Sequence, residues 1–370
     1  MTIDELRIIE HTNTQIRYLP IISQILRTIG GKSMSTTILK TILDKWSIEQ
    51  ERKSSLYRNH NGILTNNEKP TTAFPYYIEL MLNLGLLSKI NDVVRNSKYG
   101  ILFLTLEKFN TENLSLSQIE KFFYLFFILL KDADNVILIL QIINENNGVA
   151  DYKYLREQYE IYLKQRLKLK AINSSSYSQL AISNKLRKVE FVWQNAKEYS
   201  KHIIPPRIEW LIDIGILQEV DNKKSKKFEF SDLGKKFYNS LEFIDDSKTK
   251  DINDLWLLDQ FVYVFQFLCK KNNKITDFNT LDEASKIEFL SEIIPVAYKE
   301  LDTDGMRRIS GLPFYIFVMI IGVVQYNLSI SFSSLKSKLL QSFTTHQFTF
   351  AFRESSRINE SYLTVSINEL

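Results

Sequence analysis

Apolar residues along this chain recur mainly at the three- and four-residue spacing that places them on one face of a helix. Residues 205–217 show this spacing clearly, because Ile208, Leu211 and Ile214 form one apolar stripe. Gly215 follows at the point where a helix ends most easily, since glycine adopts a positive φ at little cost. Two short extended runs come next, separated by a polar segment with four lysines. The pattern predicts a helix that ends at a glycine and continues into a β-hairpin.

The same pattern occurs earlier in the chain, in residues 75–87. Pro, Ile, Glu, Gly and the final Leu are identical in the two copies, and Asn83 corresponds to Asp213. A repeat is stronger information than a single motif, because chance would have to produce it twice. In the first copy we expect the two strands of the hairpin at residues 86–90 and 101–104, joined by a polar loop.

A helix that ends in Gly-Leu-Leu or Gly-Ile-Leu and runs into a β-hairpin resembles the last helix and the wing of winged helix-turn-helix domains. The resemblance implies a third helix that lies in the major groove of DNA, with the wing close to the backbone or the minor groove. It equally allows a protein-contact role, because winged-helix repeats also serve as dimerisation and bridging parts.

The stretches before both copies predict further helices, so we expect three domains. Unit 1, residues 1–112, has helices expected at 14–30 and 36–46 before its repeat. The second domain, residues 113–245, combines a helical core with winged-helix unit 2. Its nearly apolar stretches, 119–130 and 135–143, predict two buried helices or one long kinked helix.

The third domain, residues 246–370, is predicted to be a helical region with a terminal hairpin. Two alternating runs at 348–352 and 363–367 indicate that hairpin, which makes this region a possible degenerate winged helix. The expected fold class is therefore mainly α with small β-hairpins, with tandem winged-helix units and a helical C-terminal region ending in a hairpin.

Composition supports a globular protein, since 44% of the residues are hydrophobic and 12% are aromatic. The single cysteine, Cys269, excludes an internal disulfide and a cysteine-rich zinc site. The first residues carry acids and no apolar run of a signal peptide. The longest uncharged apolar run, residues 311–324, is shorter than the roughly 20 residues of a membrane span. We therefore expect a cytoplasmic protein without a membrane partner.

Positive charge is concentrated rather than abundant, since the net charge is only +4 but residues 161–201 hold nine basic residues and two acids. Lysine and arginine provide the phosphate contacts that dominate DNA affinity. We therefore expect DNA contacts at this segment, at the third helix of unit 2 and at its wing. The expected DNA-binding residues are Lys164, Arg166, Lys168, Lys170, Lys185, Arg187, Lys188, His202, Arg207, Lys223, Lys224, Lys226 and Lys227.

The third helix of unit 1 has a different character. It offers Tyr76 and Tyr77, with no basic residue between Pro70 and Ser88, so these two tyrosines are candidates for a protein contact. Aromatic and acidic residues on a third helix favour a protein partner, whereas Arg, Lys, Asn or Gln favours base edges.

The sequence offers no catalytic motif. The four histidines, His11, His60, His202 and His346, lack metal-ligand spacing. The glycine pair before Lys32 does not complete a phosphate loop, because Leu26 occupies the position of the first glycine. We expect no catalytic residue, no metal, no cofactor and no small-molecule ligand. A nuclease-type site of scattered acids has no fixed spacing and stays open.

The sequence thus predicts a non-catalytic DNA-binding subunit of a larger complex, which contacts duplex DNA and other protein subunits. The Lys, Asn and Ile content is typical of AT-rich bacterial genomes, and with the architecture it suggests genome defence, including antiviral defence, or DNA processing. The alternative is a winged-helix protein-interaction or scaffold subunit that does not bind DNA, such as an accessory subunit of a chromosome-organising or defence ATPase.

Overall fold

The computed structural model describes residues 6–10, 12–58, 60, 62–107, 114–193, 196–220, 226–244, 249–268, 275–301, 308–341, 348–355 and 361–367. Within these ranges the chain is mainly helical with small, mostly antiparallel sheets, which confirms the predicted fold class at this level. Its internal contacts divide it into two compact units. The large unit contains Asp4–Arg95 and Glu112–Asn253, and the small unit contains Asn96–Thr111 and Asp254–Leu370. The large unit thus contains most of the first two expected domains and the first residues of the third, up to Asn253, whereas Asn96–Thr111 lie in the small unit.

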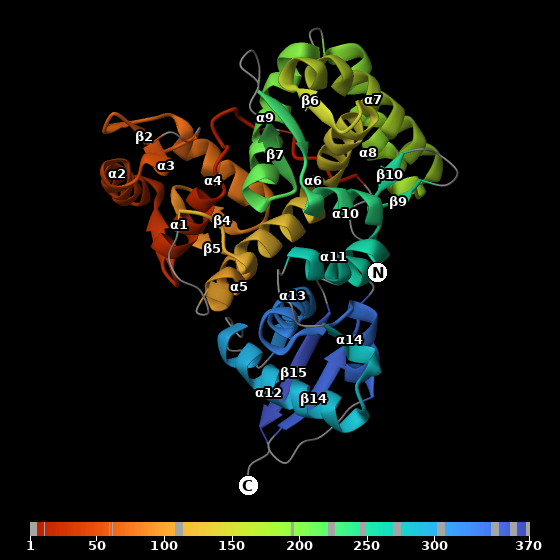
Figure 1. Cartoon of the computed structure of the whole chain (residues 1–370). Coiled ribbons are helices and arrows are strands. Elements are labelled where there is room, and N and C mark those ends of the chain that lie inside the picture. Colours follow the sequence, from red (N-terminus) through yellow and green to blue (C-terminus); the bar gives the residue numbers. More distant parts are fainter. Residues whose placement is uncertain are drawn as a thin grey trace. The chain divides into compact units, whose positions relative to one another are not determined.

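The first half of the large unit contains a three-stranded antiparallel sheet with helices around it (Figure 1). β1 pairs with β5, and β5 lies beside β4, so the strand order is β1-β5-β4. The helix expected from residue 14 begins only at a proline, a residue that suits the first turn of a helix. The elements are α1 (Pro20–Ile29), β1 (Ser33–Ser35), α2 (Thr36–Lys53), α3 (Ser55–Arg58), β2 (Thr65–Asn66), β3 (Lys69–Pro70), α4 (Ala73–Asn83), β4 (Leu87–Ile90) and β5 (Val93–Asn96).

The hairpin of this half is shorter than predicted. Asn91 has a positive φ of 52°, so the chain turns tightly after β4, and β5 begins at Val93. Residues 101–104, expected to form the return strand, lie instead in helix α5 (Lys98–Glu107) of the small unit. This prediction was wrong because a short apolar run does not distinguish a strand from a buried helix.

The second half of the large unit repeats the arrangement of the first. β6 and β7 both pair antiparallel with β8, which gives the strand order β6-β8-β7. The predicted hairpin after Gly215 is confirmed. The elements are α6 (Gln118–Glu145), β6 (Val149–Asp151), α7 (Tyr152–Asn173), α8 (Ser176–Arg187), the π-helical turn η1 (Lys188–Val192), α9 (Ala196–Ile214), β7 (Leu217–Val220), β8 (Lys227–Phe230), α10 (Asp232–Ser240), β9 (Glu242–Phe243) and β10 (Lys250–Asp251).

Helix α6 is the central element of this half, and it is one long kinked helix. The kink lies at Asp132, whose φ of −140° is not helical. Asp132 and Asp134 are both buried, although each carries a carboxylate. Buried carboxylates need hydrogen bonds or opposite charges, so partners must come from other elements.

The small unit contains α5 and the C-terminal part of the chain. α5 packs against α12 and α13. The terminal hairpin is confirmed, and its second strand also pairs with β12, which gives the order β12-β15-β14. The remaining elements are η2 (Trp256–Gln260), α11 (Phe261–Leu268), β11 (Thr276–Asp277), η3 (Phe278–Thr280), α12 (Glu283–Leu301), β12 (Arg308–Ser310), α13 (Gly311–Ile321), η4 (Gly322–Tyr326), β13 (Leu328–Ser329), α14 (Phe332–Leu340), β14 (Phe348–Arg353) and β15 (Tyr362–Ile367).

The apolar helix α13 is buried along its whole length. Among the described residues, no helix combines the length and the apolar character that crossing a membrane requires. Cys269 lies outside the described residues.

One order of elements, helix-strand-helix-helix-strand-strand, therefore occurs three times. The core elements are α1-β1-α2-α4-β4-β5, α6-β6-α7-α9-β7-β8 and α12-β12-α13-α14-β14-β15. In each copy the last strand lies in the middle of its sheet and pairs with the strand that follows the first helix. The third copy shares this topology although its sequence lacks the Gly-Leu-Leu helix end.

The glycines of the sequence repeat end the third helix of the first two copies. Gly85 has a φ of 75° and Gly215 a φ of 91°. After Gly215, the Ile216 amide donates to the carbonyl of Leu211 at 2.8 Å, and the first copy has the equivalent bond. This pairing is the Schellman motif, which needs a left-handed residue at the glycine position.

Replacing Gly215 with alanine is expected to lower the free energy of unfolding by about 1–2 kcal/mol, the usual cost of a left-handed L-residue. Steric overlap is not the cause, because the nearest atom to an added Cβ is the Lys121 Nζ at 3.8 Å. Urea denaturation measures the change. Gly31→Ala is the control, since an added Cβ there meets no atom within 4 Å. Equal stability of Gly215→Ala and wild type would contradict the motif.

Candidate functional site

The segment before α1 joins the two halves of the large unit. Its backbone is bonded to side chains of the second half: the Ile9 amide donates to Asp132 at 2.8 Å. From the other side, Trp210 Nε1 donates to the carbonyl of Ile16 at 2.7 Å. The N-terminal segment thus covers the kink of α6 and the middle of α9.

Helix α9 is the third helix of the second copy, and it is used for internal packing. Every residue from Ile203 to Leu211 is buried. The expectation that this helix lies in a DNA groove stays a prediction, and the structure shows that its residues 203–211 pack against the protein itself. His202 is exposed at the edge of the buried stretch.

Arg207 is fully buried in α9 and cannot contact DNA in this structure. Its Nε lies 2.6 Å from Asp132 Oδ2, and its Nη2 lies 3.1 Å from Oδ1, so the pair is bidentate. The guanidinium also donates to the carbonyls of Ile203 and Ile9. Burial raises the pKa of Asp132 above its ordinary value, although Arg207 acts in the opposite direction. The sequence prediction missed this because the spacing of a helix does not reveal a partner 75 residues away.

Arg166 and Lys170, one helical turn apart on α7, are also buried. Both bind Asp134, at 2.6 Å and 2.8 Å, and both pair with Asp251. Burial acts to raise the pKa of Asp134, but Lys170 and Arg166 outweigh it and lower that pKa to about 2. These cations join α7 to the kink of α6 and to β10, so neither is available to a phosphate.

The other predicted cations of this region lie nearer the surface. Lys164 pairs with Glu160 at 2.6 Å, and Lys168, 60% exposed, lies 3.4 Å from Glu190. Arg187 is exposed at the end of α8. The ion pairs reduce the local positive field, so the predicted concentration of charge is mostly neutralised by nearby acids.

The β7–β8 hairpin of the second copy retains part of its predicted charge. Lys226 is exposed and lies 3.0 Å from Glu219 on the facing strand, and Lys227 begins β8. Lys223 and Lys224 lie outside the described residues.

The two predicted protein-contact tyrosines differ in role. Tyr77 is fully buried, and its hydroxyl donates to the Gly62 carbonyl at 2.9 Å and accepts from the Tyr18 amide at 3.0 Å. It therefore supports the fold, and it is not a surface contact. Tyr76 is half-buried, and Glu79 is exposed one turn later.

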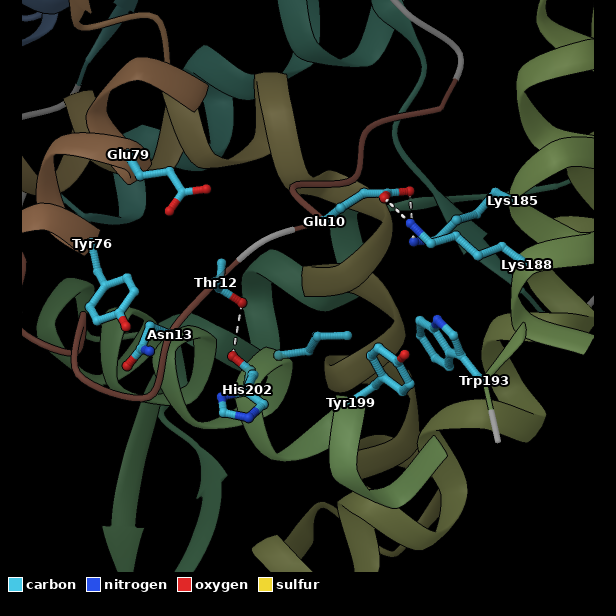
Figure 2. Close-up of a pocket in the computed structure, with 11 residues that line it drawn as sticks. Glu10, Thr12, Asn13, Tyr76, Glu79, Lys185, Lys188, Trp193, Tyr199 and His202 are labelled. Carbon is cyan, nitrogen blue, oxygen red and sulfur yellow. Dashed lines mark hydrogen bonds and ion pairs between the residues drawn. The ribbon is translucent and has the colours of Figure 1, made fainter. Parts of the chain in front are cut away.

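Tyr76 and Glu79 line a pocket between the two halves of the large unit (Figure 2). The pocket has a volume of about 370 Å³. It is formed by the N-terminal segment, α4, the α8–η1 region and α9. The lining residues are Glu10, Thr12, Asn13, Tyr76, Glu79, Lys185, Lys188, Trp193, Tyr199, His202 and Ile203.

Glu10 holds the two lysines of the pocket together. Its carboxylate lies 3.0 Å from Lys185 Nζ and 2.6 Å from Lys188 Nζ (Figure 2). Burial acts to raise the pKa of Glu10, but the bonds from Lys188 and Lys185 lower it to about 2. Burial lowers the pKa of Lys185, against the opposing effect of Glu10. Lys185 is therefore buried in an ion pair, whereas Lys188 is partly exposed.

Two stacked rings form the adjoining wall. Trp193 and Tyr199 are nearly parallel, with an interplanar angle of 8° and ring centroids 4.8 Å apart. Lys185 Nζ lies 5.4 Å from the centre of the Trp193 ring, within the range of a cation–π contact. The Trp193 indole nitrogen is buried and has no hydrogen-bond partner among the described residues.

Sequence reasoning named Lys185, Lys188, His202 and Tyr76 but did not place them together. It missed Glu10 and Trp193 altogether. The one available signal was a tryptophan directly after Phe191 and Val192, and a tryptophan in such a run occurs as often in a core. The described residues contain no group of three or more His, Cys, Asp or Glu side chains that could hold a metal ion.

Comparison with known proteins gives no family. The chain matches no family model, no curated protein and no solved structure.

Proposed function

We propose that each of the three helix-strand-helix-helix-strand-strand copies is a winged-helix domain. The support is the shared strand order, in which the last strand is central, together with the glycine-terminated third helix of the first two copies. The first copy has a tight two-stranded wing, and the second has the lysine-containing wing.

We further propose that the chain is a non-catalytic subunit of a larger complex, and that its winged-helix domains make protein contacts. The carrying observation is the state of the third helices of the first two copies, α4 and α9. α9 is buried from Ile203 to Leu211, and the exposed residues of α4 include Glu79 but no cation. Residues 203–211 of α9 are thus not available to base edges, and α4 would bring the negative charge of Glu79 toward phosphates.

The large unit also exposes apolar side chains that a protein partner would cover. Phe191 is 79% exposed and Val192 57% exposed, at the end of η1. Neighbouring apolar side chains in this position favour a partner surface, since large aromatic groups are enriched at the core of interfaces. Arg187, exposed at the end of α8, precedes this patch in the sequence and fits a partner with acidic residues around its apolar contact.

Direct DNA contact through the wing of the second copy is the second candidate. Lys226 and Lys227 lie on the predicted hairpin, and Arg187 and Lys168 remain exposed. A contact of this kind would be a backbone contact without base readout, because the groove-facing role of α9 is absent.

Fluorescence anisotropy with a duplex of about 30 base pairs across a salt series separates these candidates. For a protein-contact subunit we expect only weak binding, with a Kd above about 10 µM at low salt. Micromolar binding that falls steeply with salt would favour the wing, provided that replacing Lys223, Lys224, Lys226 and Lys227 with alanine abolishes it. The charge-matched control replaces Lys32, Lys53, Lys69 and Lys89, which are exposed in the first half.

The protein contact has its own test in the native cells. The wild-type chain is expected to co-purify with a partner at a fixed stoichiometry, and Phe191→Ser is expected to lose it. Ile90→Ser is the matched control, because Ile90 is 69% exposed on β4. Equal loss with both variants, or with neither, would contradict a contact at Phe191.

A further inference from the structure

The pocket of the large unit contains a buried donor that its own side chains do not satisfy. Trp193 is only 8% exposed and lines the pocket, and its indole N–H has no partner among the described residues. A buried donor without a partner destabilises the fold, because no hydrogen bond replaces the one it loses to water. The donor therefore calls for an acceptor that enters the pocket.

The adjacent lysines indicate that this acceptor is an anion. The Glu10 carboxylate already occupies one position between Lys185 and Lys188, which shows that the two ammonium groups are placed to hold an oxyanion. An ammonium group has three donors, and each lysine uses one on Glu10 in the described contacts. Donors thus remain for a second oxyanion beside the Trp193 N–H.

The remaining residues of the pocket indicate that the anion is attached to a planar group with hydrogen-bonding atoms along its edge. The rings of Tyr76, Tyr199 and His202 line the space, and ring faces bind planar groups by stacking. Asn13 and Glu79 stand on the side away from Trp193 (Figure 2) and offer an amide and a carboxylate. An amide and a carboxylate match the donor and acceptor edge of a nucleobase. A volume of about 370 Å³ also exceeds what phosphate alone would fill and lies in the range of small-molecule sites.

We propose that this pocket binds a nucleoside 5′-monophosphate. The phosphate lies at Lys185, Lys188 and the Trp193 N–H, and the base lies toward Tyr76, Asn13 and Glu79. The inference rests on the pocket alone and holds whether the chain contacts protein or DNA. It replaces the expectation from sequence that no small molecule binds. Because the lining residues come from both halves of the large unit, an occupied pocket would connect those halves.

Isothermal titration calorimetry of the full chain with AMP, GMP, CMP and UMP tests the proposal, with adenosine and inorganic phosphate as separate arms. At least one nucleotide is expected to bind at least about 10-fold more tightly than either fragment, because neither fragment makes both sets of contacts. Inorganic phosphate binding as tightly as every nucleotide would reveal a simple anion site and overturn the base contact. Adenosine binding as tightly as AMP would overturn the phosphate contact. Absence of binding by all six probes at about 5 mM would overturn the whole proposal.

Variants assign the contacts. Lys188→Met is expected to weaken nucleotide binding about 10-fold, through loss of a charge-assisted bond. Lys168→Met removes the same charge outside the pocket and is expected to change the Kd less than about two-fold. Trp193→Phe keeps an aromatic ring but removes the N–H, and is expected to weaken binding about 3- to 10-fold.

Substitutions of the two acidic residues of the pocket are expected to change nucleotide affinity in opposite directions. Glu10→Gln removes the internal competitor for the lysines and is expected to tighten binding about 3-fold. Glu79→Gln makes the same change of charge at the base side and is expected to weaken binding of the preferred nucleotide. Tightening by both variants would show a general field effect and overturn the base contact. Weakening by Glu10→Gln, in a variant whose circular dichroism matches wild type, would overturn the placement of the phosphate.

Discussion

Replacing Asp132 with alanine is expected to lower the free energy of unfolding by about 3–5 kcal/mol. The carboxylate is fully buried and binds the Arg207 guanidinium through both oxygens, the Ile9 amide and the Asn135 side chain. Without it, Arg207 stays buried with an uncompensated charge, and the N-terminal segment loses one of its bonds to α6. Urea denaturation followed by circular dichroism measures the change.

A double-mutant cycle distinguishes the ion pair from general damage to the core. Arg207→Met combined with Asp132→Ala is expected to cost clearly less than the sum of the single changes, because the second change removes the charge that the first leaves unpaired. Glu49→Gln is the surface control, since its pair with Lys53 is exposed, and it should alter stability by less than about 0.5 kcal/mol. Strict additivity of the two core changes would contradict the pairing.

Asp134→Asn is expected to lower the free energy of unfolding by a similar amount at neutral pH. The size of this destabilisation should depend on pH, because it follows the ionisation of Asp134. The pKa of Asp134 is lowered from 3.8 to about 2 in the folded protein. A lowered carboxylate pKa stabilises the fold fully above the unfolded value, and this stabilisation is lost as the pH falls toward about 2. The wild type should therefore lose about 2 kcal/mol of its advantage over the variant between about pH 5 and pH 2.

Denaturation of both proteins across this pH range measures the difference. Glu10 also has a lowered pKa, but it is present in both proteins, so its contribution cancels in the comparison. A constant difference between wild type and Asp134→Asn at all pH values would show that Asp134 is not held ionised by Lys170 and Arg166.

The parts of the fold that sequence predicted are those decided by local chemistry. Gly215 ends a helix because its backbone conformation requires it, and the alternating Phe228–Phe230 forms a strand because its apolar face must be buried. The prediction of a strand at residues 101–104 failed because packing between distant elements, and not local chemistry, decides their structure. Leu102, Phe103 and Leu106 are buried by packing against other helices, and four apolar residues in a row fit a strand equally well.

The candidate site was less predictable than the fold, because the sequence shows where a charged residue lies but not which residue of opposite charge it pairs with. Arg166, Lys170, Lys185 and Arg207 looked like a basic surface but are buried against Asp134, Asp132 and Glu10. A usable signal existed in the two aspartates between the nearly apolar stretches 119–130 and 135–143, since buried carboxylates need cations from elsewhere. The pocket could not be predicted, because Glu10, Tyr76 and Trp193 meet only in the tertiary structure.

Helix α5 has a consequence for how the protein folds during synthesis. It ends at Glu107, but α12, against which it packs, begins only at Glu283. At the usual rate of translation, roughly 10–35 s separate the emergence of α5 from that of its partner. Throughout that interval Leu102, Phe103 and Leu106 have no C-terminal helices to cover them, although the large unit is already being completed. The apolar helix α5 therefore leaves the ribosome well before the helices that bury it. Nascent chains of this protein are expected to depend on chaperones until the small unit has folded.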